Sequence, residues 1–240
     1  MIWIVLSPVT WYNKNVPILK KINKDFFKKW TSEMAYVLGF FAADGCITVS
    51  KRGSQFWSIQ IKDKELLEEI RKVTGSEHMI SIRQGKRNGN DLYRFQVGSI
   101  EMCNNLRTLG YSERKTENLA LPHVPKKYIS DFVRGYFDGD GSVWVGEVHK
   151  KRKTKTVVIS VAFTSGSQNF LTRLQLVLSG AIFTTGSISK RKGKECWCLR
   201  YSVRDSLKLC DFMYNSNVQS NKLLLTRKKQ VFEEYRELQS

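Results

Sequence analysis

The stretch FVRGYFDGDGSV, residues 132–143, decides the fold because the chain contains a second copy of it. The segment YVLGFFAADGCI, residues 36–47, aligns with it without a gap, and the last acids of the two copies, Asp44 and Asp140, lie 96 positions apart. Each copy reads as an apolar helix that ends at an acid and a glycine. An acid is disfavoured at a helix C-terminus, which carries a partial negative charge. The two aspartates therefore need an explanation from the rest of the chain.

The pattern that follows each copy is also repeated, and a repeat of this length indicates a duplicated structural unit. In the first half, alternating apolar segments flank two turns at residues 52–54 and 85–90, and helical runs follow at 64–75 and 99–111. The second half has the same order. We therefore predict an α+β fold with two pseudo-symmetric α-β-β-α-β-β-α halves, whose motif helices pack at the centre.

The boundaries of the halves follow from this alignment. Residues 31–118 form the predicted first half, residues 119–130 form a linker that contains Pro122 and Pro125, and residues 131–240 form the second half with a C-terminal amphipathic helix. Residues 1–30 have no counterpart in the second half. We treat them as an N-terminal extension without an assigned role.

Charge and cysteine content restrict the partners and the compartment. The chain has 40 Lys and Arg against 22 Asp and Glu, a net charge of +18, which favours a polyanion such as nucleic acid as partner. Five cysteines without a C-x-x-C pair indicate a reducing, intracellular compartment, either a prokaryotic cytoplasm or an organelle matrix. The apolar opening MIWIVLSPVT is short and is expected to be neither a signal peptide nor a membrane span, so no membrane partner is predicted.

Small residues recur at positions i and i+4 within each motif, and this spacing lets two helices approach closely. Gly39 and Ala43 form one such strip, and Gly135 and Gly139 form the other. If the strips face each other, Asp44 and Asp140 meet at the helix ends and need a cation. Oxygen ligands without nearby His or Cys favour Mg²⁺, and Mn²⁺ or Ca²⁺ can occupy the same kind of site. The alternative is that the glycines are helix caps and the aspartates are solvated turn residues.

With both motifs in register, the chain resembles the LAGLIDADG homing endonucleases of the single-chain, two-motif type, over about residues 31–235. The resemblance implies a monomer whose antiparallel sheets form a saddle over the major groove of double-stranded DNA. It also implies that the protein cuts both strands of a long, asymmetric site and leaves 3′ overhangs. Asp44 and Asp140 match the family's metal-binding acids, with backbone groups of Ala43 and Gly139 as further candidates, whereas Gly39 has a packing role only. Asp138 aligns with Ala42 and is therefore expected to be secondary.

The resemblance also implies basic residues close to the metal. Lys115 fits this place in the first half, and Lys222, or Gln219 in another register, fits it in the second half. Such a lysine can stabilise the charge that develops on the phosphate. Asp63 and Ser165 match a peripheral position in the two halves.

All four predicted hairpins carry basic residues, which indicates phosphate contacts, and a two-stranded ribbon fits the major groove. Alternate strand residues, including Ser189, can reach base edges. The residues expected to contact DNA are Lys51, Arg52, Gln60, Lys62, Arg83, Lys86, Arg87, Arg94, Lys151, Arg152, Lys153, Lys190, Arg191, Lys192 and Arg200.

Two other functions fit the same fold: an intron maturase that assists RNA splicing, and a catalytically silent DNA-binding regulator. Acids in both motifs favour the nuclease, because neither alternative needs them. Protein-splicing chemistry is not expected, since Met1 is neither Cys nor Ser and the chain does not end in His-Asn.

Overall fold

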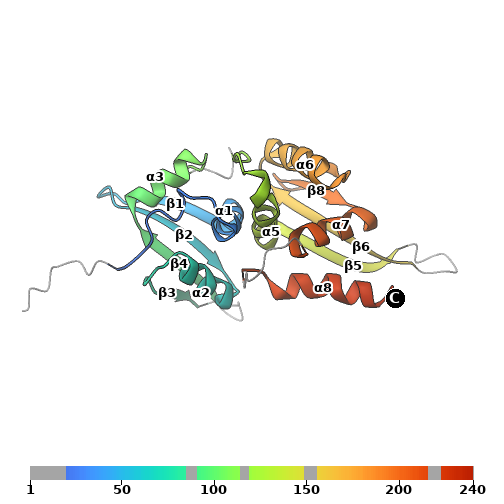
Figure 1. Cartoon of the computed structure of the whole chain (residues 1–240), viewed down its shortest axis with the longest axis horizontal. Helices are drawn as coiled ribbons and strands as arrows, with labels where there is room; N and C mark the ends of the chain where they lie inside the picture. Colours follow the sequence, from blue (N-terminus) through green and yellow to red (C-terminus); the bar gives the residue numbers. More distant parts are fainter. Residues whose placement is uncertain (1–19, 85–90, 114–118, 149–155, 216–222, 240) are drawn as a thin grey trace, which may run out of the picture.

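A computed structural model of the chain describes residues 20–84, 91–113, 119–148, 156–215 and 223–239. Two halves lie side by side, and each consists of one antiparallel four-stranded sheet with helices on one of its faces (Figure 1). Within the described part of the chain, no helix is both long and apolar enough to cross a membrane.

The first half follows the predicted order of elements. Its strands are arranged as β1-β2-β4-β3, and each neighbouring pair is antiparallel. Its elements are α1 (Ser32–Asp44), β1 (Gly45–Val49), β2 (Gln55–Ile61), α2 (Lys64–Val73), β3 (Ile80–Arg83), β4 (Leu92–Gly98) and α3 (Ile100–Thr108).

The second half repeats this order, with the strands arranged as β5-β6-β8-β7. A short 3₁₀ helix precedes it and a further helix follows it. The prediction of two pseudo-symmetric α+β halves is confirmed. The elements are η1 (Lys126–Tyr128), α5 (Ile129–Asp140), β5 (Gly141–Val148), β6 (Thr156–Ser165), α6 (Gln168–Ile182), β7 (Ser187–Lys190), β8 (Trp197–Tyr201), α7 (Val203–Tyr214) and α8 (Thr226–Glu237).

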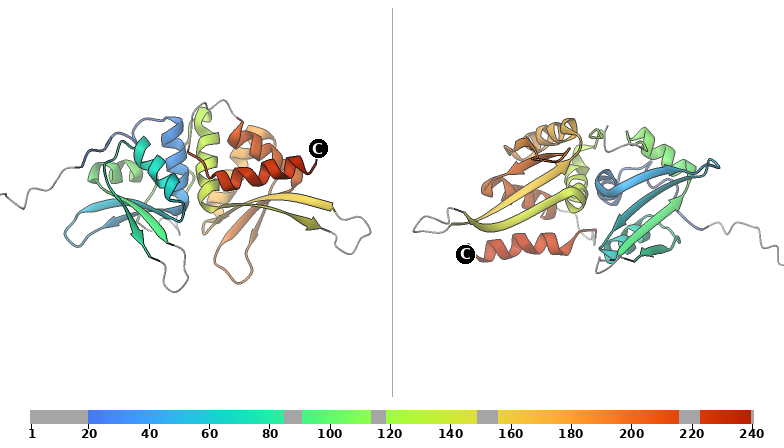
Figure 2. Two further views of the ribbon diagram at one scale, coloured as in Figure 1. Left: turned by 90° about the horizontal axis from the view of Figure 1, so that it is seen from below. Right: turned by 180° about the vertical axis from the view of Figure 1, so that it is seen from behind.

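Helices α1 and α5 lie side by side between the halves, and the strands of both sheets splay away from their ends (Figure 2). A side chain on Gly39 would overlap the carbonyl oxygen of Phe132, and one on Gly135 would overlap that of Tyr36. Glycine is therefore the residue that lets the two backbones touch. Both helices are buried on nearly every side. Helix α1 is mostly apolar, whereas α5 buries the charged residues Asp131, Arg134 and Asp138 together with its apolar residues.

Aromatic residues fill the core of each half, and in the first half they come partly from the N-terminal segment. Phe26 and Phe27 are buried, and Phe27 meets the fully buried Trp57 edge to face at 5.4 Å. Residues 20–30, to which the sequence assigned no role, therefore supply part of the first core. In the second half, Tyr136 packs against Phe170 at 4.5 Å.

Candidate active site and nucleic-acid interface

Each motif helix ends at its aspartate, and the next residue already has an extended conformation. Gly45 and Gly141 have φ near −85° and donate their N–H groups to Phe41 and Phe137. A Cβ atom on either glycine would overlap the side chain of that same phenylalanine. Glycine is thus needed for space and not for a positive φ. The sharp helix-to-strand junction places the aspartate at the open end of the helix pair.

The two motif acids converge from opposite halves. Asp44 Oδ2 lies 3.2 Å from the position that a Cβ on Gly139 would occupy, so the Asp44 carboxylate reaches across to the residue before Asp140. The Asp44 residue is exposed and Asp140 is half-buried. A Cβ atom at position 139 would overlap the Ala43 Cβ atom and crowd the Asp44 carboxylate, so glycine there lets the two helix ends come together.

The donor set at this point fits a hard divalent cation. Two carboxylates converge there, and oxygen is the ligand atom that Mg²⁺ prefers. Among the described residues, no group of three or more His, Cys, Asp or Glu side chains could hold a metal ion. An ion at the helix ends would therefore take Asp44 and Asp140 as its acidic ligands and fill its other positions with carbonyl, water or phosphate oxygens.

Asp138 has a different environment from Asp140, although only one residue separates them. It is 2% exposed, and its Oδ2 accepts hydrogen bonds from the Tyr36 hydroxyl at 2.7 Å and from the Leu225 N–H at 2.9 Å. Burial raises the pKa of the Asp138 carboxyl. Asp138 therefore joins α1, α5 and the segment before α8.

Lys228 in α8 closes the end of α5 from the other side. Its Nζ donates to the carbonyl oxygens of Phe137 at 2.6 Å, Asp138 at 2.8 Å and Gly141 at 2.6 Å. A cation at a helix C-terminus is favourable, because the last carbonyl groups have no partner within the helix. Desolvation lowers the pKa of Lys228 to about 8.

Sequence analysis did not identify Lys228, although the sequence contained a signal. Lys228, Phe232 and Tyr235 are the buried residues of α8 and follow helical spacing. A lysine on an apolar stripe is unusual and indicates a buried partner.

A second buried cation ties α5 to the C-terminal segment. Arg134 is 5% exposed, forms an ion pair with Asp131 at 2.7 Å and donates to the Met213 carbonyl at 2.9 Å and the Leu223 carbonyl at 3.3 Å. Its guanidinium also lies 5.3 Å from the centre of the Tyr36 ring in α1. Arg134 thus connects both motif helices with the end of α7 and the start of α8.

The peripheral positions Asp63 and Ser165 make protein contacts of their own. Asp63 precedes α2 and forms an ion pair with Arg227 of α8 at 3.2 Å, which links the two halves. Ser165 is buried, and its hydroxyl accepts a hydrogen bond from the Ser167 N–H at 3.1 Å.

Several residues that the sequence assigned to the site lie outside the described ranges. They are the candidate catalytic residues Lys115, Gln219 and Lys222, and the candidate DNA contacts Lys86, Arg87, Lys151, Arg152 and Lys153.

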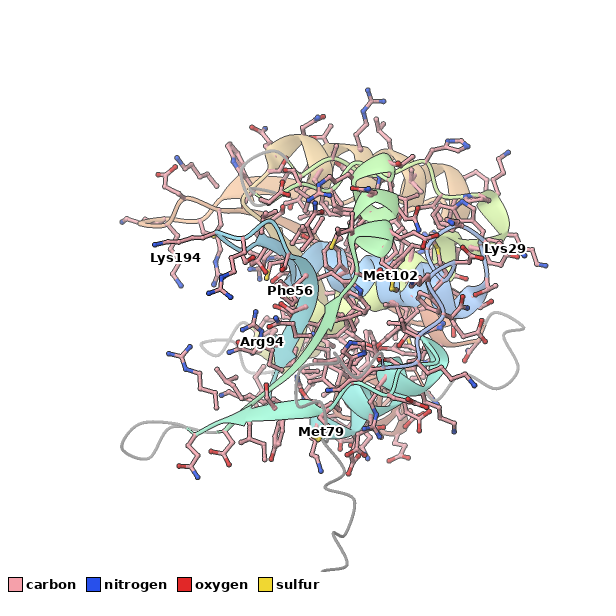
Figure 3. All side chains as sticks on the ribbon, turned by 90° about the vertical axis from the view of Figure 1, so that its left-hand side faces the viewer. Lys29, Phe56, Met79, Arg94, Met102 and Lys194 are labelled. Atoms are coloured by element: carbon pink, nitrogen blue, oxygen red, sulfur yellow. The ribbon has the colours of Figure 1, made fainter. Side chains whose placement is uncertain are left out.

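The described candidate DNA contacts lie on the strands and turns of the two sheets. Gln60 faces Arg94 across β2 and β4, and the Arg94 guanidinium donates to the Ser58 hydroxyl at 3.4 Å. Figure 3 shows Arg94 on the side of the molecule away from α1, and Lys194, a further basic residue in the turn between β7 and β8, lies on that side as well. The other described members of this set are Lys51, Arg52, Lys62, Arg83, Lys190, Arg191, Lys192 and Arg200.

Comparison with known families gives a match over both halves. Residues 31–115 and 127–212 each match the family described as LAGLIDADG-like domain. The two matched segments contain the two motifs and most of the two sheets.

Solved structures with the same fold are LAGLIDADG nucleases. The meganuclease I-AabMI bound to uncleaved DNA is 16% identical with a TM-score of 0.57, and the alignment covers 85% of this chain and 90% of that chain. The homing endonuclease I-SmaMI bound to cleaved DNA is 16% identical with a TM-score of 0.58, over 88% and 89%. I-WcaI bound to its DNA recognition sequence is 17% identical with a TM-score of 0.54, over 86% and 90%.

The curated proteins that match part of this chain are much longer than it is. A probable translation initiation factor IF-2 from Thermococcus kodakarensis is 31% identical over 122 residues, which are 48% of this chain and 10% of that protein. The corresponding factor from Methanocaldococcus jannaschii is 25% identical over 59% of this chain and 11% of its own length. The chain thus spans about a tenth of the length of these relatives, and their role in translation is not assigned to it.

Proposed function

The chain belongs to the LAGLIDADG family, whose domain it carries twice, and we propose that it is a site-specific endonuclease that makes a double-strand break in DNA. The observation that carries this proposal is the convergence of Asp44 and Asp140 at the ends of two contacting helices, between two sheets with basic residues. We further propose a long, asymmetric target, because two halves with different side chains read two different half-sites.

Each motif acid serves one strand in the proposed mechanism. Asp44 and Asp140 would together hold Mg²⁺ at the helix ends, and Mn²⁺ or Ca²⁺ could take its place. When bound, such an ion supplies activation of water and stabilisation of charge on the scissile phosphate. Because the two acids end contacting helices near the axis between the halves, we expect the two cuts to fall close together and the overhangs to be short. Their 3′ polarity is what the resemblance to the family implies.

The chain itself holds these acids and the duplex in place. Lys228 binds the carbonyl groups on both sides of Asp140 and so fixes the backbone that presents this carboxylate. Arg94 and Arg200 lie in the middle of the two sheets, where their guanidinium groups can bind phosphate or base edges. Lys115 and Lys222 remain the proposed basic residues near the phosphate.

The test uses the DNA made by joining the sequences that flank this reading frame in its genome. The purified chain should cut both strands of that junction in Mg²⁺ and leave it intact when a chelator is added, and sequencing of the ends should give 3′ overhangs. Asp44→Asn and Asp140→Asn should each abolish cutting and retain binding, measured by gel shift. Asp25→Asn, at an exposed acid in the N-terminal segment, is the matched control and should cut normally.

Two results would contradict the proposal. If Asp44→Asn or Asp140→Asn cuts DNA as well as the wild type, the substituted aspartate is not a required metal ligand. An intact junction together with faster splicing of the flanking RNA would identify the chain as a maturase.

A further inference from the structure

Trp144 is an exposed aromatic residue on the open face of the second sheet. Its neighbours in β5, Val143 and Val145, pack against the core, so the Trp144 side chain points to the opposite face, away from the helices. It is 51% exposed. Sequence analysis assigned no role to this residue.

The indole lies along its own strand. A Cβ atom on Gly146 would lie 2.9 Å from Trp144 Cε2 and overlap its Cζ2 atom, so the ring covers the place where a side chain at position 146 would stand. Any residue other than glycine would displace the ring. Glycine at position 146 therefore lets the indole lie against the open face of the sheet, where its own face is presented to a ligand.

A hollow in the sheet lies beside the ring. It is lined by Ser142, Trp144, Ser160, Ala162 and Arg200. In the sheet register, Trp144 pairs with Ser160, while Ala162 lies between Ser142 and Arg200. The hollow thus combines an apolar wall with a guanidinium group and two hydroxyl groups.

The first half has a different surface at the equivalent place. The 96-residue offset between the motifs puts Thr48 opposite Trp144. The aromatic residue beside Thr48 is Phe56, which pairs with it from β2 and is half-buried, and further along the sheet Cys46 contacts the Ser58 hydroxyl at 3.2 Å. The two halves therefore place their open-face aromatic residue on different strands, and Trp144 is the more exposed of the two.

We propose that Trp144 is a specificity-determining residue that recognises the 5-methyl group of a thymine in the major groove, with Arg200 beside it to bind an adjacent base or phosphate. This inference rests on the proposed function. The thymine methyl is the apolar group that base edges present in the major groove, and a two-stranded ribbon can reach it. The net charge of +18 favours DNA as the occupant of this face.

The position of Trp144 on β5 also limits which base pair it reads. Trp144 follows Asp140 by four residues, and a strand rises about 3.3 Å per residue, so the two lie up to about 13 Å apart along the strand. This distance corresponds to about four base pairs at about 3.4 Å each. We expect the preferred thymine within about four base pairs of the cut made next to Asp140, in one half-site only.

The experiment selects bound duplexes from a random DNA library with the full chain, then with Trp144→Thr, which introduces the residue found in the first half. The wild type should enrich a thymine at one position of one half-site, and Trp144→Thr should lose that preference. Leu176→Thr, at an exposed apolar residue on helix α6, is the control and should leave the preferred sequence unchanged.

Replacing that thymine by deoxyuridine, which lacks the methyl group, provides the second measurement. Wild-type affinity should fall about four-fold, the equivalent of ~0.8 kcal/mol for one buried carbon group, and the affinity of Trp144→Thr should not change. Thermal melting of the variant confirms that it is folded.

The possible results separate this inference from the proposed function. An enriched site with equal preferences in wild type and Trp144→Thr, or equal wild-type affinity for thymine and deoxyuridine, would overturn the role of Trp144 alone. If the wild type enriches no DNA sequence, the proposed function fails, and the inference fails with it.

Discussion

The hydroxyl group of Tyr36 in α1 donates a 2.7 Å hydrogen bond to Asp138 in α5, across the boundary between the two halves. Both side chains are buried, and burial together with the Asp138 carboxylate raises the pKa of Tyr36 well above its usual value. Tyr36 therefore stays protonated and remains a donor. This contact fixes one motif helix relative to the other close to the residues proposed for catalysis.

Loss of this hydrogen bond should destabilise the fold. Tyr36→Phe removes the donor and leaves a buried carboxylate with one partner fewer, which typically costs about 1–3 kcal/mol. The control is Tyr128→Phe, at a half-buried tyrosine outside the helix pair, for which we expect a change within about 0.5 kcal/mol. Chemical denaturation measures both values. Equal stability of the two variants would show that the contact contributes nothing to joining the halves.

Substitution of glycine by alanine should have opposite effects at the contact between α1 and α5 and at an exposed position. Gly39→Ala and Gly135→Ala would push a methyl group into a backbone carbonyl of the other helix, and overpacking of this kind typically costs about 1–3 kcal/mol or more. Gly180→Ala is the control, because Gly180 lies in helix α6 with open space around it. That substitution should stabilise the fold by about 0.5–1 kcal/mol. The melting temperatures should therefore shift in opposite directions, and a stabilising Gly39→Ala would contradict the close packing.

The repeated fold was predictable because its signals are local. The duplicated motif, the alternating strands and the i, i+4 spacing of Gly39 with Ala43 all appear within short stretches of sequence. Small residues at positions i and i+4 lie on one face of a helix and allow a second helix to approach closely. Their spacing therefore predicted that the two motif helices contact each other, and not only that they are helices. The metal role of Asp44 and Asp140 stays a prediction that the proposed experiments test.

The contacts that the sequence did not reveal are those between distant segments. Tyr36 bonds to a residue 102 positions away, and Lys228 bonds to carbonyl groups about 90 positions away. A single sequence gives no register between such segments. Asp138 shows the consequence: its alignment with Ala42 indicated a secondary role, but the sequence did not reveal that its side chain lies in the interior and accepts a hydrogen bond from α1.

Lys228 should be required for both stability and cutting. Lys228→Met removes the donor that three carbonyl groups share at the junction of α5 and β5, although the Phe137 carbonyl keeps the Gly141 N–H. We expect a net cost of about 2 kcal/mol, because this loss exceeds the gain from removing a buried charge. Cutting should also fall, since the carbonyl groups on both sides of Asp140 lose their anchor. Lys229→Met is the neighbouring control: Lys229 is half-buried and forms an ion pair with Glu233 at 3.0 Å, one helical turn along α8. Normal stability and cutting by Lys228→Met would refute a positioning role.

The salt dependence of DNA binding distinguishes the two faces of each sheet. Each phosphate contact that a cation makes contributes about −0.9 to the slope of log affinity against log salt concentration. Lys62 follows β2 on the same side as Gln60 and Arg94, whereas Lys72 lies on α2, which covers the other face. Lys62→Gln should therefore reduce the magnitude of the slope by about 0.9, and Lys72→Gln, with the same loss of charge, should leave the slope almost unchanged. The measurement is a series of binding titrations at salt concentrations from about 50 to about 200 mM, the range over which the affinity of such proteins for DNA falls steeply. If the two variants give the same slope, binding depends on net charge alone, and the open face of the sheets is not the DNA-binding surface.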